Sequence, residues 1–134
     1  MIAADIDRDI AALPEVMRLA DAFFDSASAP AARYAVELAL EEIFTNMVKY
    51  NESGRGAIRV GIDRREDEIV VTLVDPDAPR FDPFTEAPDT DVSASLAERT
   101  PGGLGIHLVR KMMDRIEYSH TNRTATVTLY KRVH

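Results

Sequence analysis

Residues 101–114 read PGGLGIHLVRKMMD, and this passage from glycines into an apolar helical pattern is the most informative stretch of the chain for its fold. Ile106, Val109 and Met112 recur at helical spacing behind the glycines. Glycines let a backbone come close to a ligand, and the free N–H groups at a helix start bind phosphate oxygens. A tight loop entering a helix is the alternative. The P-loop pattern is excluded, because Lys followed by Ser or Thr does not come after the glycines.

A second helical pattern precedes it over residues 31–51 and contains LALEEIFTNMVKY at 38–50. Glu42 and Asn46 lie one turn apart on one face of this helix, about 40° from each other, whereas Glu41 is about 140° away from Asn46. A carboxylate and a carboxamide so placed could hold a hydroxyl or water together with a hard cation such as Mg²⁺. A solvated helix face is the alternative.

Strand patterns lie between these two segments. Apolar and polar residues alternate over 58–63, and IVVTLV at 69–74 predicts a strand buried on both faces. The strand runs into LVDPDAPRFDPF at 73–84. Asp75 and Asp77 are therefore placed to accept a hydrogen bond from a ligand amine. Ordinary turn chemistry explains the same residues equally well.

The order of elements predicts an α+β fold, a two-layer α/β sandwich with about three helices on one face of a mostly antiparallel sheet. Pro14 suggests that the first helix starts near it. The expected elements are a helix within 7–28, a helix over 31–51, strands at 58–63 and 69–74, a long loop over 75–101, a helix after the glycines, and strands at 115–120 and 124–130.

Composition limits the function further. The chain has 134 residues, a net charge of −7 and no cysteine. The negative charge argues against nucleic acid or an anionic membrane as the main partner. The absence of cysteine excludes disulfides, thiolate metal sites and a catalytic thiol. With no signal peptide or membrane span in the sequence, we expect a cytoplasmic protein.

The order of these features resembles the Bergerat-fold ATP-binding domain of the GHKL superfamily. The features are, in sequence, the Glu-x-x-x-Asn helix, the Asp after a strand, the long loop and the Gly-x-Gly helix start. Within it, the chain is similar to the small bacterial anti-sigma factors that are serine/threonine protein kinases. The matching stretches are 38–50, FDPF at 81–84 and LAERTPGGLGIHLVRKMMD at 96–114. The resemblance covers nearly the whole chain. It implies one histidine-kinase-like ATP-binding domain over 1–134, with an ATP lid at about 84–101.

The resemblance also implies roles for individual residues. Glu42 would be the catalytic general base for the attacking hydroxyl, and Asn46 would bind Mg²⁺ that bridges the ATP phosphates. Asp75, or Asp77 in another register, would hold the adenine amine, and Arg99 is a candidate for meeting the terminal phosphate. The residues expected to wrap the phosphates are Gly102, Gly103, Leu104 and Gly105.

The same resemblance implies partners. The protein substrate would be a serine or threonine of a STAS-type anti-sigma factor antagonist, and the second partner would be a sigma factor. Direct contact with nucleic acid or membrane is not expected, and a homodimer stays open.

One departure from the family pattern supports a second hypothesis. The first glycine box of the family carries glycines or a Pro-containing relative, whereas DPDAPRF at 75–81 has no glycine. Alignment on Phe81 and Asp82 puts Pro76 at the adenine-binding position, and a one-residue insertion restores Asp75. The alternative is thus a non-catalytic partner-binding module of the same fold with weakened or lost ATP binding.

Overall fold

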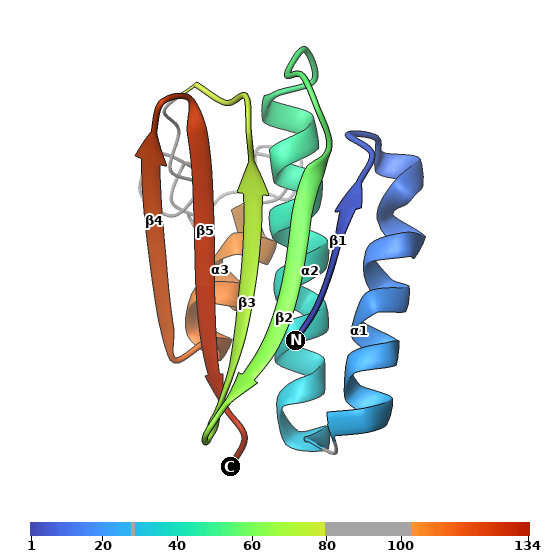
Figure 1. The fold of residues 1–134 in the computed structure, drawn as a ribbon. Helices are drawn as coiled ribbons and strands as arrows, with labels where there is room; N and C mark the ends of the chain where they lie inside the picture. The colour runs from blue at the N-terminus through green and yellow to red at the C-terminus, as the bar shows by residue number, and fades with distance from the viewer. Residues whose placement is uncertain (28, 80–102) are drawn as a thin grey trace.

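The computed structural model describes residues 1–27, 29–79 and 103–134, and in this part of the chain three α-helices cover one face of an antiparallel five-stranded sheet (Figure 1). The helices are α1 (Leu13–Ala27), α2 (Pro30–Tyr50) and α3 (Gly103–Met112), with a short 3-10 helix at Ile10–Ala12 before α1. The strands are β1 (Ile2–Ile6), β2 (Ile58–Arg65), β3 (Glu68–Asp75), β4 (Arg115–Thr121) and β5 (Thr124–Arg132). The predicted α+β two-layer sandwich is confirmed.

The strand order β1-β2-β3-β5-β4 makes β3 the central strand of the sheet. It pairs along its whole length with β5, from Glu68 opposite Arg132 to Asp75 opposite Ala125. Asp75 is therefore the last residue of the central strand. A side chain at this position lies at the end of the central strand, with neighbouring strands on both sides. Segments from both halves of the chain can therefore reach it.

Helix α2 lies between α1 and α3 against the sheet (Figure 1), so apolar residues surround most of its circumference. Leu40, Ile43 and Phe44 are fully buried. Each such side chain contributes about 1.5–3 kcal/mol when it leaves water. This packing fixes the rotation of α2 about its axis and so determines where Glu42 and Asn46 lie.

The first helix begins later than residue 7. Asp9 caps the 3-10 helix by accepting a hydrogen bond from the Ala11 N–H at 2.9 Å, and α1 starts at Leu13 with Pro14 in its first turn. Proline fits this position because the first N–H groups of a helix have no intrahelical partner. The start predicted from Pro14 is therefore confirmed.

Strand β1 is missing from the expected order of elements, so the prediction that the chain opens with a helix is wrong. β1 pairs antiparallel with β2, from Ile2 opposite Ile62 to Ile6 opposite Ile58. Its five residues include two alanines, and only Ile6 is buried. Such a short edge strand gives little alternation to detect.

The predicted burial of residues 69–74 on both faces is only partly right. Ile69, Val71 and Leu73 are fully buried in the core, whereas Thr72 and Val74 are half-buried. Antiparallel sheets commonly leave one face toward solvent, and the helices cover only the other face here. None of the described helices is long and apolar enough to cross a membrane.

Candidate functional site

A pocket lies between the second half of α2, the segment that follows β3, and strands β4 and β5. Its empty space is about 430 Å³, counted with the open mouth. Most of its lining is apolar, and among the described residues Asp75 is the one carboxylate that lines it. The lining residues are Ile43, Asn46, Met47, Tyr50, Asn51, Asp75, Ala78, Pro79, Tyr118, Ala125 and Val127.

Asn46 brings an unsatisfied oxygen to this pocket. The residue is 4% exposed, and its Oδ1 has no hydrogen-bond partner in the described parts of the chain. Buried polar atoms are nearly always paired, so an orphaned oxygen in a pocket wall points to a ligand. A carboxamide oxygen is a donor that suits Mg²⁺. The chemistry of Asn46 therefore fits the cation that the sequence predicts at this position.

Glu42 lies one helical turn before Asn46 and meets α3 at Gly105. A Cβ added at Gly105 would lie 2.6 Å from Glu42 Oε1 and closer still to Oε2, so any larger residue at position 105 would force this carboxylate to move. The structure thus brings together two predicted site residues that are far apart in the sequence. Gly103 and Leu104 form the start of α3 beside them, where backbone N–H groups lack intrahelical partners and can bind anions.

The environment of Glu42 makes its carboxylate a better proton acceptor. Burial raises the pKa of Glu42, the neighbouring charge of Glu41 adds to this, and Lys49 partly opposes it. A general base works best when its pKa approaches the working pH. The direction of the shift therefore agrees with the predicted role of Glu42.

Asp75 is held in an ion pair that the sequence did not suggest. Arg8, just after β1, donates from Nη2 to Asp75 Oδ1 at 2.7 Å and from Nη1 to Oδ2 at 2.8 Å. The two side chains are 5% and 2% exposed. Burial alone would raise the pKa of Asp75, but the hydrogen bonds from Arg8, Asn51 and the Asp77 N–H outweigh it and lower the pKa. Asp75 is therefore a carboxylate throughout the neutral pH range.

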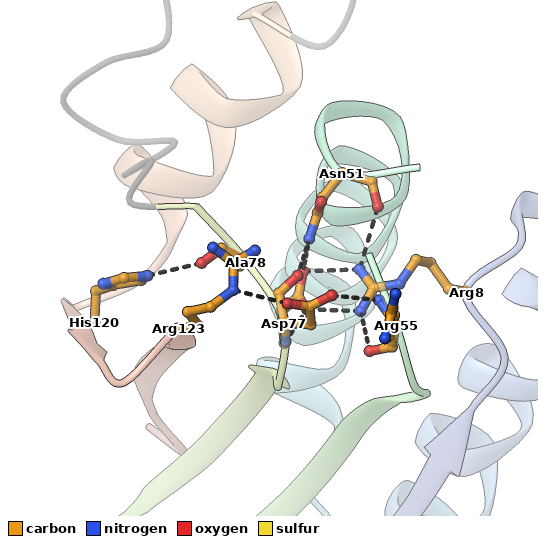
Figure 2. A network of polar contacts seen from close by, with 8 residues as sticks. Arg8, Asn51, Arg55, Asp77, Ala78, His120 and Arg123 are labelled. Carbon is orange, nitrogen blue, oxygen red and sulfur yellow. Dashed lines mark hydrogen bonds and ion pairs between the residues drawn. The ribbon is translucent and has the colours of Figure 1, made fainter. Parts of the chain in front are cut away.

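Asp77 lies two residues further on and points to different partners (Figure 2). Its Oδ1 accepts from Arg123 Nε at 2.9 Å and its Oδ2 accepts from the Arg55 N–H at 2.8 Å. The hydrogen bond from Arg123 is the main cause of a lowered pKa for Asp77, followed by the one from Arg55. Asp77 is absent from the pocket lining, whereas Asp75 is part of it. Of the two candidate registers, the one with Asp75 thus places a carboxylate at the pocket.

The segment after β3 is tied to the β4–β5 turn as well. The Ala78 N–H donates to the Arg123 carbonyl at 2.8 Å, and the ring Nε2 of His120 lies 2.8 Å from the Ala78 carbonyl (Figure 2). Asn51, at the end of α2, donates to the Asp77 carbonyl at 2.5 Å. A segment without glycine is held here by side chains from three other parts of the chain.

Some predicted site residues lie outside the described residues. These are Arg99, Gly102 and the lid at about 84–101. Of the remaining candidates, Glu42, Asn46 and Gly105 lie on the facing helices α2 and α3, and Asp75 lies at the pocket. Within residues 1–27, 29–79 and 103–134, no group of three His, Asp or Glu side chains could hold a metal ion.

The sequence did not indicate that Arg8 and Asn51 belong to the site. Arg8 fell within a stretch read as helical, and its partner Asp75 is 67 residues away. Asn51 follows α2 and looks like an ordinary helix-ending residue, yet it donates to Asp75 across 24 residues. The local pattern around either residue carries no signal for these contacts.

We compared the sequence and the structure of the chain with those of known proteins. The sequence profile of the histidine kinase-like ATPase domain matches residues 6–131. Among solved structures, the histidine kinase AdeS of Acinetobacter baumannii superposes with a TM-score of 0.54 at 11% identity, covering 100% of this chain and 68% of that one. At this identity the likeness concerns the fold alone. The search of curated proteins gives no match.

Proposed function

Because the chain belongs to the histidine kinase-like ATPase domain family, we propose that it binds ATP with Mg²⁺ and acts as a serine/threonine protein kinase that regulates a sigma factor. The observation that carries the ATP site is the buried Oδ1 of Asn46, a residue of the pocket wall, which has no hydrogen-bond partner among the residues that the structure describes. It is supported by Glu42, which lies one turn away and against Gly105.

In this proposal Asn46 would hold the cation through Oδ1, which no donor within 1–27, 29–79 and 103–134 occupies. The cation, once bound with ATP, supplies positive charge against the phosphates. The first backbone N–H groups of α3, from Gly103 to Gly105, bind phosphate oxygens. Phosphoryl transfer depends mainly on positioning and charge neutralisation, so these groups provide most of what the reaction requires.

Glu42 orients the hydroxyl of the substrate serine or threonine and takes its proton. The hydroxyl oxygen forms the new bond to the γ-phosphorus, the bond from that phosphorus to the ADP oxygen breaks, and the proton passes to the Glu42 carboxylate. Burial of Glu42 supports this role because it raises the pKa of the carboxyl group.

The partners are proposed from the resemblance to anti-sigma factor kinases. The acceptor would be a serine or threonine on a STAS-type antagonist, and the same chain would sequester a sigma factor when the antagonist is phosphorylated. The stretches that support this proposal are the same ones that carry the family resemblance, at 38–50, 81–84 and 96–114.

A binding module without catalysis is the second candidate. It is favoured by the glycine-free DPDAPRF segment and by the contacts that hold residues 75–78 to Arg8, Asn51 and Arg123. Because these contacts hold residues 75–78 firmly, the backbone of this segment has less freedom to adapt to a nucleotide.

The experiment that separates the two candidates is a phosphotransfer assay. The purified chain is incubated with Mg²⁺ and ATP labelled in the γ-phosphate, and STAS-domain proteins of the same genome are offered as acceptors. The kinase proposal predicts phosphoserine or phosphothreonine on one acceptor, with the rate reduced about 10²–10⁴-fold by Glu42→Gln. Glu41→Gln, on a different face of α2, is the control and should be nearly silent. Stable binding of an acceptor without phosphate transfer, together with weak or absent ATP binding, would favour the binding module.

A further inference from the structure

The hydrogen-bond capacity of Asp75 is already used within the protein. An ionised carboxylate offers about four lone-pair positions. Oδ1 accepts from Arg8 Nη2 at 2.7 Å and from the Asp77 N–H at 3.1 Å. Oδ2 accepts from Arg8 Nη1 at 2.8 Å and from Asn51 Nδ2 at 3.1 Å. These four donors leave no position for a further donor from a ligand in the pocket.

Arg8 is fixed in place by more than Asp75. Its Nη1 also donates to the Asn51 carbonyl at 3.4 Å, and its Nη2 donates to the Arg55 carbonyl at 3.3 Å. A Cβ at Gly54 would lie 2.8 Å from Arg8 Cζ, so the backbone closes over the guanidinium. A single hydrogen bond from a neutral amine is weaker than a buried bidentate ion pair. A nucleobase therefore has no means of displacing Arg8.

The charge state of Asp75 also prevents it from donating a hydrogen bond to a base carbonyl. Its lowered pKa keeps the group ionised at neutral pH. An ionised carboxylate has no O–H to donate to a base carbonyl. Asp75 thus offers the pocket neither a vacant acceptor nor a donor.

We propose that Arg8 and Asn51 determine specificity together: by occupying the acceptor positions of Asp75, they make the pocket indifferent to whether the bound purine carries an amine or a carbonyl at position 6. This inference rests on the proposed function, since it assumes that the base of a nucleotide enters this pocket. The walls around the base are mostly apolar and include Ile43, Met47 and Val127. Such walls contribute affinity through burial and do not distinguish an amine from a carbonyl.

The test compares ATP with inosine triphosphate, in which a carbonyl replaces the adenine amine, by calorimetry in the presence of Mg²⁺. For the unmodified protein we expect dissociation constants that agree within about threefold. A preference for ATP of about tenfold or more would show that an acceptor reads the amine and would overturn the inference while leaving the proposed function intact. Binding of neither nucleotide would overturn the proposed function and this inference with it.

A variant can create the missing selectivity. Asn51 lines the pocket, and its side chain donates to Asp75 Oδ2. Asn51→Ala removes this donor, while the ion pair between Arg8 and Asp75 stays. The freed position then accepts the adenine amine, so ATP should bind about tenfold more tightly than inosine triphosphate. The ratio of the two affinities cancels any change in pocket size. Arg8→Ala should produce the same preference if it folds.

Arg123→Ala is the matched control. It breaks the ion pair with Asp77 in the same network (Figure 2). The four donors to Asp75 are other groups and stay in this variant. Its ratio of affinities should equal that of the unmodified protein. An Asn51→Ala protein that binds both nucleotides equally well would overturn the inference, because freeing an acceptor of Asp75 would then change nothing.

Discussion

Asn46 contributes a buried oxygen that has no partner among the described residues, and this makes it the residue with the clearest expected effect. We expect Asn46→Ala to weaken Mg-ATP binding at least tenfold, about 1.4 kcal/mol, because the metal loses its protein ligand. The fold should stay intact, since the lost oxygen makes no hydrogen bond there. Calorimetry gives the affinity, and circular dichroism checks the fold.

Thr45→Ala is the neighbouring control for this experiment. The Thr45 hydroxyl bonds back to the Glu41 carbonyl at 2.8 Å and does not line the pocket. Its loss should leave the affinity unchanged. An Asn46→Ala protein with the affinity of the unmodified chain would remove Asn46 from the site.

The raised pKa of Glu42 gives a prediction about stability and pH. Burial is its first cause and the charge of Glu41 its second. The folded protein holds this proton more tightly than the unfolded chain does, so the contribution of Glu42 to stability is full below the unfolded pKa and is lost as the pH rises through the folded pKa. Glu42→Gln cannot ionise. Its free energy of unfolding, from urea titrations, should therefore rise relative to the unmodified protein between about pH 4 and pH 7.

The contradicting result is a difference in free energy of unfolding between Glu42→Gln and the unmodified protein that stays constant over this pH range. Such a result would mean that Glu42 ionises as freely in the folded protein as in the unfolded chain. Glu41→Gln is the comparison for charge alone, because it removes a carboxylate from the same helical turn.

At the level of single residues, helical spacing predicted that Glu42 and Asn46 share one face of α2, because helical periodicity is local. Gly105 was assigned to the same site by the family resemblance, and its close approach to Glu42 was not predicted. The partners of Asp75 could not be predicted in this way. Arg8 and Asn51 reach it across 67 and 24 residues, and no local pattern of charges specifies such a contact.

Among the elements, α3 comes close to the Glu42 side chain of α2 at Gly105. Alanine normally stabilises a helix interior by about 1 kcal/mol relative to glycine. At position 105, however, the added methyl would occupy the place of the Glu42 carboxylate. We expect Gly105→Ala to fold and to bind the partner, but to lose phosphotransfer because Glu42 is displaced.

Gly61→Ala is the control for this substitution. A Cβ at Gly61 would find its nearest neighbour, the Ala3 Cβ, at an ordinary distance of 3.6 Å. This variant should retain full activity in the same assay. Equal activity of Gly105→Ala would contradict a role for the close approach of the two helices.

The elements themselves were predictable to different degrees. Helices α1, α2 and α3 and strands β2 to β5 carry apolar periodicity long enough to detect, and their bounds in the structure differ from the expected ones mainly at the ends. Strand β1 is short, and all five of its residues pair with β2. That pairing partner lies more than 50 residues away, so the local sequence did not indicate it.

At the scale of the whole molecule, the pair of Arg8 and Asp75 joins the N-terminal segment to the central strand. Breaking a buried ion pair by removing one partner commonly costs about 3–5 kcal/mol, because the other charge stays buried. We expect Arg8→Ala to lower the free energy of unfolding by an amount in this range, measured by urea denaturation at pH 7.

Arg59→Ala provides the contrast. Arg59 also pairs with an aspartate, Asp5, but the two side chains are 56% and 64% exposed. Solvent screens such a pair, and its loss should change stability little. Equal costs for the two variants would show that burial of the Arg8 pair contributes nothing.

The most direct test of the account is a calorimetric titration of the unmodified protein with ATP, once with Mg²⁺ and once with a chelator. Asn46 is expected to reach the nucleotide through the metal, so the account predicts saturable one-to-one binding with Mg²⁺ and binding at least tenfold weaker without it. No saturable binding in the presence of Mg²⁺, or the same affinity in both titrations, would contradict it.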